Sequence, residues 1–143
     1  MADTDAPLDV VQRLVNATNE HDLAAMVACF ATDYRNETPA HPSRSFTGSD
    51  QVRANWEQIL RFVPDLRSTL VRTVVDGDTV WTEWEQRGTR LDGGEHAMAG
   101  IVILGITAGL IQWARFYLEP VTEGGDINQA VREQFVRAPG ESS

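Results

Sequence analysis

The chain has 143 residues, of which 42% are apolar and 23% charged, and a net charge of −9, proportions typical of a globular protein. Its 12 basic residues are dispersed, which excludes an extended nucleic-acid surface. No apolar run approaches the ~20 residues of a membrane span, and the acidic N-terminus lacks the pattern of a secretory signal. The single cysteine, Cys29, excludes an internal disulfide, so we expect a cytoplasmic protein without a membrane partner.

The N-terminal part of the chain predicts two helices and a short strand. Residues 8–18 and 23–30 place apolar side chains at helical spacing on one side, and Asp22 is suited to be the N-cap of the second helix. Residues 34–38 alternate as a short strand that ends at Pro39. Because each helix has only one apolar side, both helices are expected to pack on another layer.

A loop and a third helix follow. Residues 39–48 contain two prolines and predict a loop. Residues 47–50 have the spacing of a capping box, with Asp in its last place, and begin a helix that ends before Pro64. Trp56 is among the apolar side chains that recur on one side of this helix.

The rest of the chain changes to a β pattern. Strands separated by Gly-containing turns are predicted at 66–75, 79–90, 96–106 and 110–118. Gly100 and Gly105 are expected to bend the third of these strands or to form bulges in it. A short amphipathic helix is predicted at 126–137. Helices first and a hairpin-linked sheet second indicate an α+β fold.

The helices can bury their single apolar sides only against the sheet. A strongly bent, mostly antiparallel sheet of four long strands and one short strand, with three N-terminal helices across it, makes a cone-shaped barrel. Such a cone encloses an apolar pocket between helices and sheet. We expect this domain to span residues 1–121, with 122–143 as a C-terminal extension that carries the short helix.

The two sides of the predicted sheet differ. On the last strand, Phe116 shares one side with small and apolar residues, and Trp113 shares the other with Tyr117. So much aromatic surface is expected to be covered by a second subunit, through Trp81, Glu83, Glu85, Arg87, Trp113, Arg115 and Tyr117. The alternative is an acid/base site formed by the two glutamates beside an arginine. A shift of the register by one residue would exchange the two assignments.

Three segments, in this order, carry a family resemblance: FATDYRNETP at 30–39, GDTVWTEWEQRGT at 77–89 and GLIQWARFYLEP at 109–120. Over residues 8–121 the chain resembles the SnoaL-like branch of the nuclear-transport-factor-2-like superfamily, which includes ketosteroid isomerase, limonene epoxide hydrolase and SnoaL-type polyketide cyclases. The resemblance implies a cone-shaped α+β barrel that forms dimers through the open face of its sheet.

The catalytic residues of these relatives are only partly present. Tyr34 and Asn36 resemble the tyrosine and asparagine that help hold the attacking water in limonene epoxide hydrolase. The Arg-x-Asp motif of that enzyme falls on Trp84 and Gln86, and the carboxylate of the closing strand falls on Phe116. The base of ketosteroid isomerase falls on a threonine, at position 38. No catalytic set of the family is therefore complete, because none of these replacements is a general base.

The candidate catalytic residues are Tyr34, Asn36 and, in the loop that follows them, His41, which can titrate near neutral pH. Tyr34 could instead be a core residue with a satisfied hydroxyl, and Trp56 and Trp84 could be core residues too. The candidate ligand-binding residues are Trp56, Trp84, Gln86, Met98 and Phe116. Scattered histidines and the absence of a Gly-rich phosphate loop predict neither a metal nor another cofactor.

Two functions remain open. The first is a cofactor-free hydrolase, isomerase or cyclase that acts on a small, largely apolar substrate, which Tyr34, Asn36 and His41 favour. The second is a non-catalytic ligand-binding or accessory protein, which the missing carboxylate of the closing strand favours. Both predict a homodimer with an apolar pocket.

Overall fold

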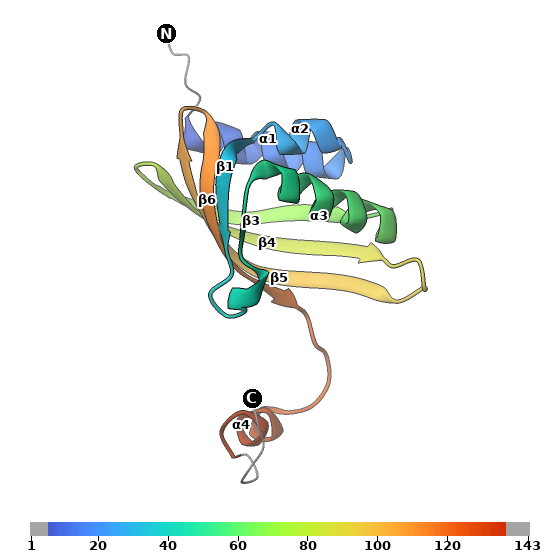
Figure 1. The fold of residues 1–143 in the computed structure, drawn as a ribbon. Helices are drawn as coiled ribbons and strands as arrows, with labels where there is room; N and C mark the ends of the chain where they lie inside the picture. The colour runs from blue at the N-terminus through green and yellow to red at the C-terminus, as the bar shows by residue number, and fades with distance from the viewer. Residues whose placement is uncertain (1–5, 137–143) are drawn as a thin grey trace.

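Helices and a single curved sheet form the structure, a computed structural model that describes residues 6–136 (Figure 1). The helices are α1 (Pro7–Asn19), α2 (Leu23–Val27), α3 (Ser49–Phe62) and α4 (Ile127–Phe135). The strands are β1 (Phe30–Glu37), β2 (Phe46–Thr47), β3 (Arg67–Asp76), β4 (Thr79–Thr89), β5 (Glu95–Thr107) and β6 (Leu110–Pro120), and a 3₁₀ turn, η1 (Pro42–Arg44), precedes β2. The predicted α+β fold is confirmed.

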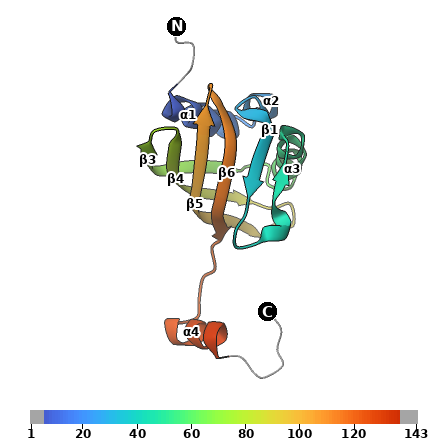
Figure 2. The ribbon, with the colours of Figure 1, turned by 60° about the vertical axis from the view of Figure 1, so that its left-hand side comes forward.

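The sheet has the order β2-β1-β6-β5-β4-β3, and β1 pairs with β6 in parallel, whereas the other neighbours are antiparallel. Figures 1 and 2 show it curling so strongly that β1 and β6 run across the direction of β3 and β4. Helices α1 and α3 lie in the hollow of this curve, on what we call the concave face. The opposite side is the convex face. The mostly antiparallel cone expected from the sequence is therefore present.

A bulge at Gln112 of β6, opposite β5, interrupts the regular pairing of these two strands. The pairing of β5 with β6 shifts register between Gly105 and Ile106. The indole of Trp113 lies where a side chain at Gly105 would stand, so only glycine leaves room for it. Gly100, the other predicted bend point, keeps the register but has a φ of +154° with its α-carbon against the backbone at Tyr117. A β-carbon would not fit there.

The core lies between α1 and the concave face. Val10, Val11 and Val15 of α1 are buried against Val80 and Leu104 of the sheet. Each such side chain contributes about 1.5–3 kcal/mol when it is removed from water. The amphipathic pattern predicted for this helix is thus the one that fastens it over the sheet.

A side-chain amide also ties the end of α1 to the first long strand. Asn19 Nδ2 donates to the carbonyl oxygen of Ser68 at 2.9 Å, and the Ser68 N–H donates to Asn19 Oδ1 at 2.7 Å. His21 adds a hydrogen bond of 2.8 Å between its Nε2 and the carbonyl oxygen of Leu66. Both backbone polar groups of Ser68 are therefore held by the end of α1.

Two local predictions around the second helix were wrong. Helix α2 begins after the predicted cap, where Asp22 accepts from the N–H of Ala25, but it ends at Val27 instead of reaching residue 30. Phe30 begins β1, four residues before the predicted strand. An apolar residue at this position fits helical spacing and strand alternation equally well, and pairing with β6 decides for the strand.

The segment 39–48 is not an irregular loop throughout. It contains η1 and the two residues of β2, which pair with β1, so the sheet has six strands where five were expected. Because Thr47 belongs to β2, it does not cap α3, whose N-cap is Gly48 without a side-chain hydrogen bond. The predicted capping box was therefore wrong.

Helix α4 lies away from the sheet in both views (Figures 1 and 2). It spans Ile127–Phe135, and Asp126 caps it by accepting from the N–H of Gln129 at 2.9 Å. Its predicted end at residue 137 lies outside the described residues. Within 6–136, none of the helices is both long enough and apolar enough to cross a membrane.

Candidate functional site

A cavity lies between the helices and the concave face. Its inner chamber, about 60 Å³, is bordered by α1 and holds Leu14, Thr18, Ser68, Trp84, Val102 and Leu104. Its outer chamber, about 300 Å³, opens between α3, β1 and the ends of β4 to β6. The two chambers adjoin, because both are lined by Phe30, Trp56, Gln86, Phe116 and Leu118.

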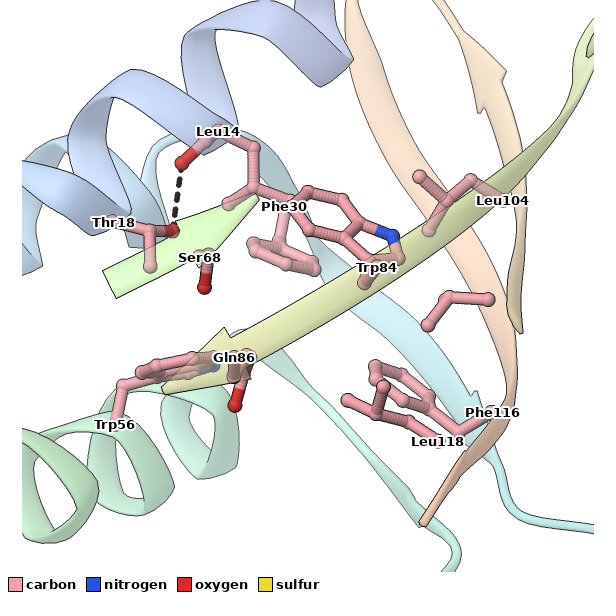
Figure 3. Close-up of a pocket in the computed structure, with 11 residues that line it drawn as sticks. Leu14, Thr18, Phe30, Trp56, Ser68, Trp84, Gln86, Leu104, Phe116 and Leu118 are labelled. Atoms are coloured by element: carbon pink, nitrogen blue, oxygen red, sulfur yellow. Dashed lines mark hydrogen bonds between the residues drawn. The ribbon is translucent and has the colours of Figure 1, made fainter. Parts of the chain in front are cut away.

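Aromatic rings from four elements form much of the cavity wall. Phe30 of β1, Trp56 of α3, Trp84 of β4 and Phe116 of β6 surround the inner chamber in Figure 3. Phe116 points into the cavity, which confirms the expected orientation of the closing strand. Since a phenyl ring stands on this wall, the wall shapes the cavity and cannot transfer protons.

Hydrogen bonds to the sheet fix the orientation of the Trp84 side chain. Its indole N–H donates to Thr82 Oγ1 at 2.6 Å, and that hydroxyl donates to the carbonyl oxygen of Val102 at 2.6 Å. Thr82 is only 1% exposed. The N–H of Trp84 is therefore already used, and the residue offers the cavity a ring surface without a donor.

Tyr34 and Asn36 are neighbours on β1 and both line the outer chamber. The Tyr34 hydroxyl donates to Asn36 Oδ1 at 2.7 Å, and both side chains are buried. Burial raises the pKa of Tyr34 above its usual value, so the phenol stays protonated. Because the phenol proton of Tyr34 is donated to Asn36, two groups of the pair remain available to a ligand. These are the amide N–H group of Asn36, which can donate, and the lone pairs of the tyrosine oxygen, which can accept.

The structure does not bring His41 to this pair. His41 precedes η1, and its Nε2 lies 3.1 Å from Glu119 Oε2, at the side of the sheet away from the cavity. It lines neither chamber. A hydrogen bond of 2.8 Å from its N–H to the carbonyl oxygen of Thr38 makes the tight turn that directs it there. Thr38 itself lines the outer chamber.

A different histidine borders the outer chamber. His96 lies at the start of β5, on the same side as Met98, and its Nε2 is buried without a hydrogen-bond partner in residues 6–136. Burial first, and the charge of Arg90 second, lower the pKa of His96 below its ordinary value, so the ring is neutral near pH 7. The alternation of side chains along the strand predicted at 96–106 could have shown that His96 and Met98 share a side.

Ser68 is the second polar residue that the sequence pattern did not single out. It is 4% exposed, and its Oγ has no hydrogen-bond partner in the described part of the chain. Figure 3 shows this oxygen pointing into the space bordered by Trp56 and Gln86. Gln86 is its direct cross-strand neighbour. The wall of the inner chamber thus contains a hydroxyl that the described residues leave unpaired.

The five predicted ligand-binding residues all line the cavity. Trp56, Gln86 and Phe116 border both chambers, Trp84 borders the inner one and Met98 the outer one. Arg44 of η1 also lines the outer chamber, although the sequence pattern did not single it out. It carries the only permanent charge among the described residues that line the two chambers.

A family model for the SnoaL-like domain matches residues 11–114, which include β1, β4, β5 and most of the cavity wall. The chain belongs to the SnoaL-like family. No curated protein sequence matches it.

Solved structures share the fold of this SnoaL-like chain. IdmH, a putative polyketide cyclase from Streptomyces antibioticus, has a TM-score of 0.69 and 22% identity, over 80% of this chain and 92% of IdmH. RV0760c from Mycobacterium tuberculosis, solved with estradiol-17β-hemisuccinate, has a TM-score of 0.69 and 20% identity, over 79% of this chain and 94% of its own. AclR, a putative hydroxylase from Streptomyces galilaeus, has a TM-score of 0.69 and 16% identity, over 79% and 88%. At such identities the similarity establishes the nuclear-transport-factor-2-like fold alone.

The convex face of the SnoaL-like sheet carries the charged residues that formed the alternative acid/base site. Glu83 pairs with Arg72 at 2.8 Å, Arg115 with Glu37 at 3.2 Å and Arg87 with Glu95 at 3.8 Å. None of these side chains, nor Glu85, lines either chamber. Trp81 and Tyr117 lie on this face with 50% and 41% of their surface exposed.

Metal ligands do not gather in the described part of this SnoaL-like chain. Within residues 6–136, no three His, Cys, Asp or Glu side chains lie close enough to hold an ion. The polar groups of the cavity are hydroxyls, amides, an imidazole and a guanidinium. These groups can bind and orient an organic molecule and can move a proton.

Proposed function

We propose that this SnoaL-like protein binds a small, largely apolar molecule in the cavity, with its apolar body against Phe30, Trp56 and Phe116. The observation that carries the proposal is the Ser68 hydroxyl, which is buried in the wall of an apolar chamber and has no hydrogen-bond partner in residues 6–136. An unsatisfied buried polar group costs about 1–3 kcal/mol. A ligand that supplies the missing hydrogen bond recovers this energy and gains the burial of its apolar surface.

The kinds of molecule handled by structural neighbours support the proposal. RV0760c was solved with a steroid ester, and IdmH is a putative polyketide cyclase. A steroid ester has a large apolar body with a few polar groups, which suits aromatic walls with isolated polar atoms.

Titration with estradiol-17β-hemisuccinate and estradiol, followed by isothermal calorimetry, tests the proposal. Gln86→Trp places an indole in the space shared by both chambers, whereas Glu85→Trp, its neighbour on β4, places one on the convex face. Gln86→Trp is expected to weaken binding by about tenfold or more and Glu85→Trp to leave it unchanged. Absence of saturable binding to the wild type, or equal binding by the two variants, contradicts the proposal.

A second candidate function is proton transfer on the bound molecule, and the position of His96 favours it. A neutral imidazole nitrogen without a partner, beside the chamber that Tyr34 and Asn36 line, has the requirements of a general base. The Asn36 amide N–H group, held in place by the hydrogen bond from Tyr34, would donate to the oxygen on which negative charge develops. A cofactor-free isomerisation or cyclisation of a ketone is the chemistry that fits.

A β,γ-unsaturated ketosteroid tests this candidate, because its isomerisation to the conjugated enone is followed by absorbance. The loss of a general base lowers kcat by about 10²–10⁴-fold, so His96→Gln is expected to lose turnover while estradiol-17β-hemisuccinate still binds. His41→Gln, which alters a histidine outside the cavity, is the matched control. Turnover that survives in His96→Gln, or no turnover by the wild type, contradicts the catalytic role and leaves ligand binding to its own test.

A further inference from the structure

The two ends of the cavity differ in the polar groups that remain open to a ligand. In the inner chamber, Thr18 Oγ1 donates to the carbonyl oxygen of Leu14 at 2.7 Å, and the N–H of Trp84 donates to Thr82. Neither donor is free. Ser68 Oγ has no partner among the described residues, and the Asn19 amide binds both the N–H and the C=O of Ser68, which fixes the backbone that carries this hydroxyl.

The inner chamber is suited to a neutral polar group. Its walls are mostly apolar, its volume is about 60 Å³, and none of its lining residues is charged. A charged ligand group would lose its hydration there without an opposite charge, which costs far more than a single hydrogen bond returns. A hydroxyl or carbonyl oxygen needs only the hydrogen bond that Ser68 offers.

The outer chamber is suited to a negative charge. Arg44 lines it from η1 and has no acidic partner among the described residues, unlike Arg72 and Arg115 on the convex face. Among residues 6–136, no Asp or Glu lines either chamber, although the whole chain has a net charge of −9. A carboxylate at the opening would meet a guanidinium and no like charge on the wall.

We infer that the molecule held in this cavity is an amphipathic acid, with its carboxylate at Arg44 and a hydroxyl or carbonyl at its far end hydrogen-bonded to Ser68 Oγ. The inference rests on the proposed ligand binding and names the ligand class and orientation. The apolar body lies between the two ends, along the wall shared by both chambers. Arg44 selects acids over their neutral derivatives, and Ser68 selects ligands with a polar far end.

Three matched compounds test the two ends separately, by calorimetry at pH 7.5: 12-hydroxydodecanoic acid, its methyl ester and dodecanoic acid. A flexible chain lets both ends find their partners whatever the separation. The wild type is expected to prefer the hydroxy acid to its ester by about tenfold and to dodecanoic acid by roughly threefold to tenfold. Arg44→Gln is expected to abolish only the first preference, and Ser68→Ala only the second.

Arg35→Gln is the control for Arg44, because Arg35 is exposed on β1 and lines neither chamber. Unchanged ester binding in Arg44→Gln shows that this variant is folded, and unchanged acid preference shows the same for Ser68→Ala. An acid preference that is absent from the wild type, or that survives in Arg44→Gln, overturns the inference while the proposed function stands. If none of the three compounds binds, the inference is wrong, and the steroid titration decides the proposed function independently.

Discussion

The concave and convex faces of the sheet use polar residues in opposite ways. On the convex face, charged side chains are numerous, partly exposed and paired within the chain, as in Arg72–Glu83 and Arg115–Glu37. On the concave face, polar atoms are few and buried, and Ser68 Oγ is left without a partner. An exposed ion pair contributes only about 0–1 kcal/mol. The side with fewer polar groups is therefore the side where each one has the larger energetic effect.

The largest test of this difference compares two tryptophans three residues apart on β4. Trp84 is 7% exposed on the concave face, and Trp84→Ala is expected to lower the unfolding free energy by about 3–5 kcal/mol. Trp81, 50% exposed on the convex face, is expected to cost about 1 kcal/mol or less within one subunit. Urea unfolding of the two variants measures both values. Equal losses would show that the faces do not differ in burial.

Association is the next test, because we expect the convex face to pair with a second copy. Val74, Trp81 and Ile103 are direct neighbours in one row across β3, β4 and β5, and the first two are 63% and 50% exposed. Trp81→Glu would bury an unpaired charge in such an interface and is expected to weaken the dimer by about 3 kcal/mol.

Light scattering checks this expectation against the subunit mass of 15.8 kDa. A wild type of twice that mass and a Trp81→Glu variant of the subunit mass are the expected results. Trp113 is a poorer site for this substitution, since its indole also packs on Gly105 within the chain. A wild type of 15.8 kDa at micromolar concentration would rule out the dimer.

The convex and concave faces were predictable where strand alternation is uninterrupted. On β6 the pattern around Phe116 and Tyr117 assigned the two faces as the structure has them, because pairing with β5 keeps one register over this part of the strand. On β3 a register shift between Leu70 and Arg72 changes which residues face inward, so alternation alone misplaces the residues beyond it.

The candidate site was less predictable than the fold. Tyr34 and Asn36 were selected by resemblance, but their hydrogen bond to each other appears only in the structure. Ser68 Oγ is unpaired because neighbouring donors such as Thr18 and Trp84 bind other acceptors. This choice of partners cannot be deduced from the sequence. His41 and His96 look alike in sequence, and a turn directs one away from the cavity while a strand directs the other to its edge.

A smaller effect is expected at the hydrogen bond beneath Trp84. Thr82→Val keeps the shape of the side chain but leaves the indole N–H buried without an acceptor, which is expected to cost about 1–3 kcal/mol of unfolding free energy. Thr69→Val changes an exposed threonine of β3 and is expected to cost little. Urea denaturation curves compare the two, and similar losses would argue against a special role for the concave hydroxyl.

The smallest effect concerns pH. Because burial lowers the pKa of His96 in the folded state below its unfolded value of 6.5, the unfolded chain binds this proton more readily. Its contribution therefore lowers stability as pH falls below about 6.5. His96→Asn is expected to lose less unfolding free energy than the wild type between pH 7 and pH 5. A variant with the same pH slope as the wild type would contradict this assignment.

The Asn19 amide protects one edge of the sheet. Strand β3 is an edge strand of the sheet, and the N–H and C=O of Ser68 point away from β4. Without a partner, these two groups could pair with a strand added at this edge. Asn19 accepts from one and donates to the other, as a passing backbone would. A single side chain thereby blocks β-augmentation at this point, and self-association edge to edge is discouraged beside the most buried part of the cavity.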